Sequence, residues 1–336
     1  MSRFAGAQLS GRFAWPAYVI NAARKYTREM TAENEKSLEE ARRKAAKEII
    51  QLQTNLGLEY VTDGGVGFLD IFTPYAGGVK GVSSGGNIDK YPGTRNSYYH
   101  TPVVREALKG GSGVEKHLYT EEIRGSKKAI LPSPASLALA SENSYYSNLE
   151  ELTAAYAKVV REDVRQLAKA GYDLVQLTEC FVPTGRFSKR VRKSFVTAFA
   201  DSVEVVFKGF GKRSCVYFHS GDASILLPRV LKTSVTDVGF DFNTLPRAAS
   251  TARISKNVVL GLQNTTRKLP DDWLDREADA LAARAKEYAK NLKLSKEQEV
   301  FLAPSQDYDG LQTYPQAKRR LENLAKASSA LREEWR

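Results

Sequence analysis

Segments that have the pattern of β-strands alternate with helical segments along most of this chain, and this alternation constrains its fold more than any other feature. Short apolar runs of strand length lie at 8–13, 58–61, 128–133, 173–177, 214–218, 237–242, 257–262 and 299–304. Helical periodicity marks 27–56, 148–171, 187–208, 222–232, 271–291 and 314–334. Strands joined through helices pair in parallel with right-handed crossovers, and eight such units close into a barrel. The sequence therefore predicts one α/β domain over 1–336, a (β/α)₈ TIM barrel.

Two stretches, 27–56 and 64–126, differ from the regular alternation of strands and helices. Residues 27–56 form a long amphipathic pattern that begins near Thr31 and ends at Gly57, which predicts a long N-terminal helix. Residues 64–126 are rich in glycine and tyrosine and have no clear period. We expect 64–126 to be an irregular excursion at the C-terminal face of the barrel, because long loops in compact domains usually serve a site.

Composition restricts the class of protein and its partners. No run of eighteen apolar residues occurs, so we expect no membrane partner and a cytoplasmic location. Two separated cysteines make neither a disulfide scaffold nor a structural zinc cluster. The formal net charge of +11 indicates either a solubilising surface or a polyanionic partner such as RNA.

Polar side chains follow the predicted strands, at the end of the barrel where such folds carry their chemistry. We expect catalytic roles for His219, Glu179, Asp241 and Asp307. We expect substrate contacts from Arg12, Ser133, Thr178, Gln263 and Asn264. Any one of these could be polar only because strands end at solvent, so the prediction concerns the set as a pocket.

The roles of one histidine and two cysteines remain open to alternative interpretations. His219 at a strand end could be a metal ligand, a proton shuttle or a structural histidine. Cys215 lies inside a predicted strand and is expected in the core, whereas Cys180 at a strand end is the better candidate for a thiolate.

A basic segment follows the strand at 173–177. Its cations, expected at the start of the helix at 187–208, are Arg186, Lys189, Arg190, Arg192 and Lys193. Cations at a helix N-terminus oppose the helix dipole, so a polyanion at this end would relieve their repulsion. A folate polyglutamate and RNA phosphates both fit, and a solvated charged face is the alternative.

Several of these segments together resemble the cobalamin-independent methionine synthase family, in the family's order along the chain. They are GLEYVTDGGVGFLD (57–70), KAILPSPASLALA (128–140), REDVRQLAKAGYDLVQLTEC (161–180), VYFHSGDAS (216–224), VVLGLQNTTRKLPD (258–271) and FLAPSQDYDGLQTYPQAKRRLENL (301–324). The resemblance implies a TIM barrel and methyl transfer to homocysteine on a zinc ion.

The family's catalytic residues are mostly replaced here. His219 matches the His of its His-x-Cys motif, but Gly221 stands at the Cys. The zinc-binding Glu falls near Asp241, and the last Cys falls among 305–307. In the homocysteine pocket Thr178 replaces an Asp, although Glu179 remains, Arg12 replaces a Ser and Gly65 replaces a Glu. We therefore expect no bound metal and no zinc cofactor, with a folate-type methyl donor still open.

Four hypotheses follow. The chain could be a methyltransferase-like enzyme or an accessory subunit, partnered by a separate zinc-bearing methionine synthase chain, with an anionic ligand at the barrel mouth. It could equally resemble the N-terminal barrel of full-length family proteins, which has the same fold without zinc. Alternatively it is a non-catalytic protein that binds RNA or the ribosome through the basic rim, or it performs an unrelated reaction in the same barrel.

Overall fold

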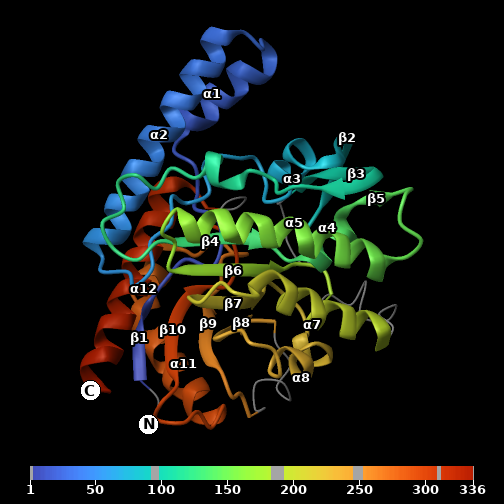
Figure 1. The fold of residues 1–336 in the computed structure, drawn as a ribbon. Coiled ribbons are helices and arrows are strands. Elements are labelled where there is room, and N and C mark those ends of the chain that lie inside the picture. The colour runs from blue at the N-terminus through green and yellow to red at the C-terminus, as the bar shows by residue number, and fades with distance from the viewer. Residues whose placement is uncertain (1–2, 92–97, 183–192, 245–252, 309–311, 336) are drawn as a thin grey trace.

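A parallel sheet of seven strands forms the centre of the computed structural model, which describes residues 3–91, 98–182, 193–244, 253–308 and 312–335 (Figure 1). The strands follow the order β1-β10-β9-β8-β7-β6-β4, and all neighbours are parallel. Their bounds are β1 Arg3–Ala7, β4 Lys128–Pro132, β6 Leu174–Glu179, β7 Arg213–Phe218, β8 Asp237–Asp241, β9 Asn257–Gln263 and β10 Glu299–Pro304. Most strand residues are buried, as expected of a sheet covered on both faces.

The segment at 58–61 lies between the two outer strands of this sheet. Isolated bridges pair Gln8 with Tyr60 and Val61 with Lys127, both in parallel. The Glu59 amide donates to Ala7 O at 3.0 Å, and the Val61 amide donates to Ser126 O at 2.9 Å. The predicted strand at 58–61 is thus present only as two bridges.

The first predicted strand, at 8–13, is misplaced. The strand is β1, which ends at Ala7, and 8–13 continues from it with only the bridge at Gln8. The residues of β1, RFAGA, are mostly small and only partly apolar, so the alternation of apolar and polar residues typical of a strand is weak there. The segment QLSGRF has this alternation but does not form a ladder of strand hydrogen bonds. Residues 8–13 instead carry the chain over the carboxyl end of the sheet.

Helices cover the outer face of the sheet. The long ones are α2 Ala32–Asn55, α5 Leu149–Lys169, α7 Lys193–Phe207, α11 Glu277–Asn291 and α12 Tyr314–Glu334. The short ones are α4 Pro134–Ala140, η2 Ala223–Ile225, α8 Leu227–Val230 and α10 Asp271–Leu274. Side-chain caps fix the starts of α2 and α5, where Thr31 accepts from the Asn34 amide and Asn148 accepts from the Glu151 amide.

The long helix predicted at 27–56 corresponds to α2, and a helix that was not predicted precedes it. α1 spans Ala17–Arg28, and α2 begins only after the Thr31 cap. The two pack against each other and extend beyond the sheet at the top of Figure 1. α1 buries only Val19 among its twelve residues, and it was not predicted.

The excursion at 64–126 was expected to be irregular, but it contains regular secondary structure. It contains α3 Thr73–Gly78, the antiparallel strands β2 Lys80–Lys90 and β3 Tyr98–Lys109, and η1 Val114–His117. The short β5, Glu142–Asn143, joins β3 to complete a second sheet. Glycines and serines in β2 hide the strand period in the sequence. Tyr91 and Tyr99 pack on Phe72, and Tyr99 also contacts Phe181 beyond the end of β6.

A buried amine lies at the edge of the central sheet. Lys128 is 1% exposed, and its Nζ donates to Gln8 Oε1 at 2.7 Å and to Leu9 O at 2.5 Å. Burial lowers the pKa of Lys128 to about 7. Because a neutral amine still has two N–H donors, both hydrogen bonds survive deprotonation.

Lys128 makes stability depend on pH. Between about pH 7 and about pH 10 the unfolded chain holds a proton on Lys128 that the folded chain has released, so the free energy of unfolding rises with pH. We expect the stability of the wild type relative to Lys128→Met to increase across this window, with a slope approaching one proton. Urea unfolding at a series of pH values measures it, and a pH-independent difference would contradict the assignment.

Candidate active site at the carboxyl ends of the strands

The carboxyl ends of β6, β7 and β10 bring a cysteine, a histidine and an aspartate together. His219 directly follows β7 and is buried. Its Nδ1 lies 3.9 Å from Sγ of Cys180, and its Nε2 lies 3.8 Å from Oδ1 of Asp307. Within the described residues the Nε2 atom has no hydrogen-bond partner. Burial lowers the pKa of His219, although Asp307 and Asp241 oppose this shift.

An arginine holds the aspartate of this cluster. The Arg12 amide donates to Asp307 Oδ1 at 2.7 Å, and Arg12 Nε lies 3.4 Å from Oδ2. The guanidinium also donates to the carbonyl of Leu69 in the excursion. A Cβ at Gly11 would lie 2.0 Å from Asp307 Oδ1, so this turn accommodates the carboxylate only with glycine. The turn at 11–12 thus fixes Asp307 beside His219.

Glu179, at the end of β6, is engaged in the local turn. Its Oε1 accepts from the amides of Phe181 and Val182 at 2.9 and 3.0 Å, and its Oε2 accepts from Ser133 Oγ. Ser133 is also the N-cap of α4. Burial raises the pKa of Glu179, while these donors oppose the shift. The structure therefore joins Glu179 with Ser133 in a buried network that shapes the loop after β6.

Asp241, at the end of β8, also has its oxygens occupied. Oδ1 accepts from the amide and side chain of Asn243, both at 3.0 Å. Oδ2 accepts from Thr244 Oγ1 at 3.1 Å and from Gln306 Nε2 at 3.2 Å. Burial raises the pKa of Asp241.

Of the expected substrate contacts, the structure brings only some to this cluster. Thr178 is buried and accepts from Gln176 Nε2 at 2.9 Å. Gln263 donates to Arg320 O at 2.8 Å and accepts from Tyr308, and Asn264 accepts from Thr266. Gln263 and Asn264 line a separate cavity beneath α11, so the structure does not bring them to His219.

The two cysteines are both buried and form no disulfide. Cys215 contributes to an apolar cluster with Tyr217 and Phe301, as expected of a core residue. Burial raises the pKa of Cys180 well above its usual value, and the charges of Glu179 and Asp307 add to this effect. Cys180 is therefore a thiol and not a thiolate at neutral pH.

A groove that sequence reasoning missed opens beside Arg12. It has a volume of ≈ 440 Å³ and is lined by Arg12, Trp15, Ile20, Leu69, Tyr314 and others. None of its described lining residues is acidic. Its wall includes Thr313, the N-cap of the 21-residue helix α12, and a helix N-terminus favours anions. Trp15 and Tyr314 lie near opposite ends of the sequence, so no local motif could indicate the groove.

The basic segment is only partly described. Arg186, Lys189, Arg190 and Arg192 lie outside the described residues. Lys193 is exposed at the first position of α7.

Two kinds of feature are absent from the described residues. Within residues 3–91, 98–182, 193–244, 253–308 and 312–335, no three His, Cys, Asp or Glu side chains are grouped so that they could hold a metal ion. In the same part of the chain no helix has the length and apolar character to cross a membrane.

Two solved structures of methionine synthases share this fold. The chain superimposes on a B12-independent methionine synthase from Shewanella sp. W3-18-1, described in complex with selenomethionine, with a TM-score of 0.73, 17% identity and coverage of 89% and 90% of the two chains. A putative vitamin-B12 independent methionine synthase from Listeria monocytogenes gives a TM-score of 0.72 at 16% identity, with coverage of 98% and 99%. At these identities the likeness establishes the fold.

Sequence comparison places the chain in a family. A methionine synthase from Sulfolobus acidocaldarius is 22% identical over 90% of this chain and 85% of its own length. One from Saccharolobus islandicus is 24% identical over 62% of this chain, and the match spans only 61% of that relative. Residues 14–267 match the family described as "Cobalamin-independent synthase, Catalytic domain". As the resemblance of its motifs predicted, the chain belongs to the cobalamin-independent methionine synthase family.

Proposed function

We propose that this chain is a methionine-synthase-like protein that binds a folate-type organic anion in the groove beside Arg12 and does not perform zinc-dependent methyl transfer alone. The observation that carries the proposal is the groove itself. It combines the Arg12 guanidinium, which also contacts Asp307, with the N-terminus of α12 and apolar walls. This combination suits a flat body with a negatively charged tail.

The residues at the strand ends do not fit a catalytic zinc, which needs about three protein ligands. At the position of the family's Cys, Gly221 has a φ of 81°, a conformation that favours glycine over cysteine. Both Asp241 oxygens accept hydrogen bonds from neighbouring side chains. Cys180, His219 and Asp307 remain, but Cys180 lies against Nδ1 and Asp307 against Nε2, so among the described residues these three side chains do not converge on one metal position. A separate zinc-bearing methionine synthase chain could supply the missing site, in which case this chain acts as an accessory subunit.

His219 gives this site a proton acceptor. Because burial lowers its pKa, the imidazole is neutral at pH 7, and Nε2 carries no hydrogen bond from the described residues. Asp307, held by Arg12, would stabilise the imidazolium once a proton arrives. His219 does not line the groove, and Asp307, which contacts both Arg12 and His219, connects the two.

We also propose that the whole chain forms one domain and that 58–61 acts as the eighth strand of a closed barrel. Bridges from Tyr60 to β1 and from Val61 to Lys127, next to β4, support this closure.

Calorimetric titration with 5-methyltetrahydrofolate tests the proposed ligand. We expect saturable binding that Arg12→Met weakens roughly tenfold or more, because a charge-assisted contact contributes about 1.5–3 kcal/mol. Arg24→Met is the matched control, since Arg24 is an exposed cation of α1 that does not line the groove. Absence of binding, or equal losses in the two variants, would refute the proposal.

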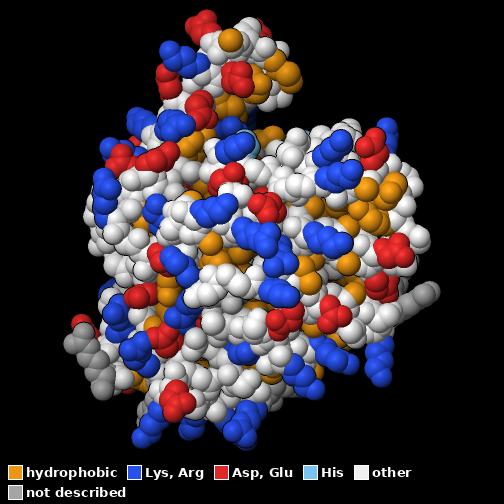
Figure 2. Space-filling model, viewed as in Figure 1, with side chains coloured by type: hydrophobic (Ala, Val, Ile, Leu, Met, Phe, Trp, Pro, Cys, Tyr) orange, Lys and Arg blue, Asp and Glu red, His pale blue; other side chains and the backbone are white. Residues whose placement is uncertain are grey.

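RNA or ribosome binding through the basic rim is the second candidate. The net charge of +11 favours it, and Figure 2 shows Lys and Arg side chains spread over one face among fewer Asp and Glu. Contacts to phosphate weaken steeply with salt. Sedimentation with ribosomal particles at low salt but not at high salt would support this candidate, and sedimentation free of particles at both would refute it.

A further inference from the structure

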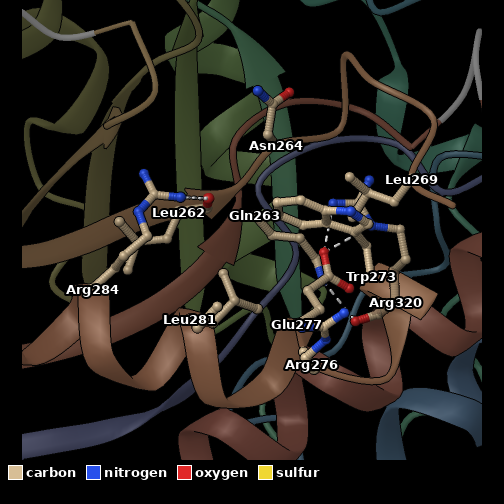
Figure 3. A pocket seen from close by; sticks show the side chains of 11 residues that line it. Leu262, Gln263, Asn264, Leu269, Trp273, Arg276, Glu277, Leu281, Arg284 and Arg320 are labelled. Carbon is tan, nitrogen blue, oxygen red and sulfur yellow. Dashed lines mark hydrogen bonds and ion pairs between the residues drawn. The ribbon is translucent and has the colours of Figure 1, made fainter. Parts of the chain in front are cut away.

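A second cavity lies outside the central sheet, between the end of β9 and the helices α10, α11 and α12. Its volume is ≈ 240 Å³. Figure 3 shows Arg284 on one side of it, Trp273 and Leu269 on the other, and the Arg320–Glu277 pair beside Trp273. Its lining is shared neither with the groove beside Arg12 nor with the cluster around His219.

The charged groups of this cavity are unbalanced. Arg276, Arg284 and Arg320 line it, with Glu277 as the one acidic residue among its lining. Arg284 donates to Leu262 O and to Asn243 Oδ1, which are both uncharged acceptors. Arg276 is exposed and lies 3.9 Å from Asp272. The lining therefore carries an excess of positive charge.

The NH1 group of Arg320 is a hydrogen-bond donor without an acceptor among the described residues. Its side chain is 1% exposed, and its Nε and NH2 both donate to the same Glu277 oxygen, at 3.0 and 2.6 Å. The other Glu277 oxygen accepts from Asn323 at 3.2 Å. Across the described residues Arg320 NH1 finds no acceptor. A buried donor without a partner is costly, and a ligand oxygen would satisfy it.

The rest of the lining is apolar. Leu262, Leu269, Ala280 and Leu281 contribute aliphatic surface, and the Trp273 ring stands at the cavity with the residue 62% exposed. A large aromatic side chain that remains exposed beside a cavity is typical of a binding surface.

We propose that this cavity is a binding site for a small carboxylate with a flat apolar body. The carboxylate would accept from Arg320 NH1, in a cavity whose lining also includes the positive charges of Arg276 and Arg284. The body would lie against Trp273 and the leucines. This site is independent of the proposed folate-type function, and its failure would leave that proposal intact.

The probe for this site is 2-naphthoate, compared with the uncharged 2-naphthamide by ligand-observed NMR. We expect the wild type to bind the carboxylate saturably and the amide at least tenfold more weakly, because one charged hydrogen bond is lost. Ala280→Phe narrows the cavity while both members of the buried pair, Arg320 and Glu277, are retained, and it should weaken 2-naphthoate binding at least tenfold. Ala283→Phe is the matched control, because Ala283 is exposed on the same helix and does not line the cavity.

Each outcome decides the matter. The proposal holds if 2-naphthoate binds to wild type and Ala283→Phe, binds weakly to Ala280→Phe, and is unaffected by Arg12→Met. It is overturned if 2-naphthoate shows no saturable binding, if the two phenylalanine variants bind alike, or if the amide binds as tightly as the carboxylate.

Discussion

Replacing Glu277 by glutamine is expected to lower the free energy of unfolding by about 3–5 kcal/mol, because it leaves a buried guanidinium without its counter-charge. The Arg320 side chain is 1% exposed and the Glu277 side chain is 7% exposed. Nε and NH2 of the guanidinium both donate to Glu277 Oε1. Urea unfolding of the wild type and Glu277→Gln measures the effect directly.

An exposed ion pair close to this one supplies the control. Arg319 lies against Asp275, with side chains that are 42% and 70% exposed. Asp275→Asn should therefore cost less than about 1 kcal/mol, as expected for a solvated pair. The double replacement of Glu277 and Arg320 by leucine and methionine should regain much of the loss, because no buried charge remains. Equal losses in Glu277→Gln and Asp275→Asn would show that Arg320 is not buried as described.

Gly239→Ala is expected to cost about 3 kcal/mol, at the upper end of the range for overpacked cores. A Cβ at Gly239 would lie 2.2 Å from Cδ2 of Tyr217 and 3.1 Å from Cβ of Val259. Tyr217 cannot easily move, because it is fully buried and its hydroxyl donates to the carbonyls of Pro304 and Ser305. Urea unfolding measures this cost as well.

Gly77→Ala is the matched control for the glycine. An added Cβ at Gly77 would meet nothing within 4 Å, so this substitution should be neutral or stabilise by up to about 1 kcal/mol. A stability of Gly239→Ala equal to that of the wild type would mean that the Tyr217 ring does not occupy the space beside Gly239.

Much of the fold could be predicted because its central strands are continuous apolar runs. The strand expected at 299–304 has the observed bounds of β10, and those expected at 237–242 and 257–262 differ from β8 and β9 by one residue at the carboxyl end. β1 and the pair β2–β3 were not predicted. Their small residues and glycines carry little periodic signal, and pairing between distant segments stabilises them.

The candidate site could be predicted in part for a related reason. Parallel strands place their carboxyl ends together, so His219 and Asp307 were expected in one pocket. In the structure His219 Nε2 lies 3.8 Å from Asp307 Oδ1. Local turns determine which polar atoms of the site already take part in hydrogen bonds. The sequence could not show that Asp241 is satisfied by Asn243 and Thr244 or that Gln263 bonds to α12.

Equilibrium dialysis against buffered nanomolar zinc tests the central claim most directly, that the strand-end cluster has lost the family's metal site. The account predicts that the wild-type chain retains no stoichiometric zinc and that His219→Ala does not differ from it. One equivalent of tightly bound zinc that His219→Ala abolishes would contradict the account and assign this chain a metal-dependent reaction.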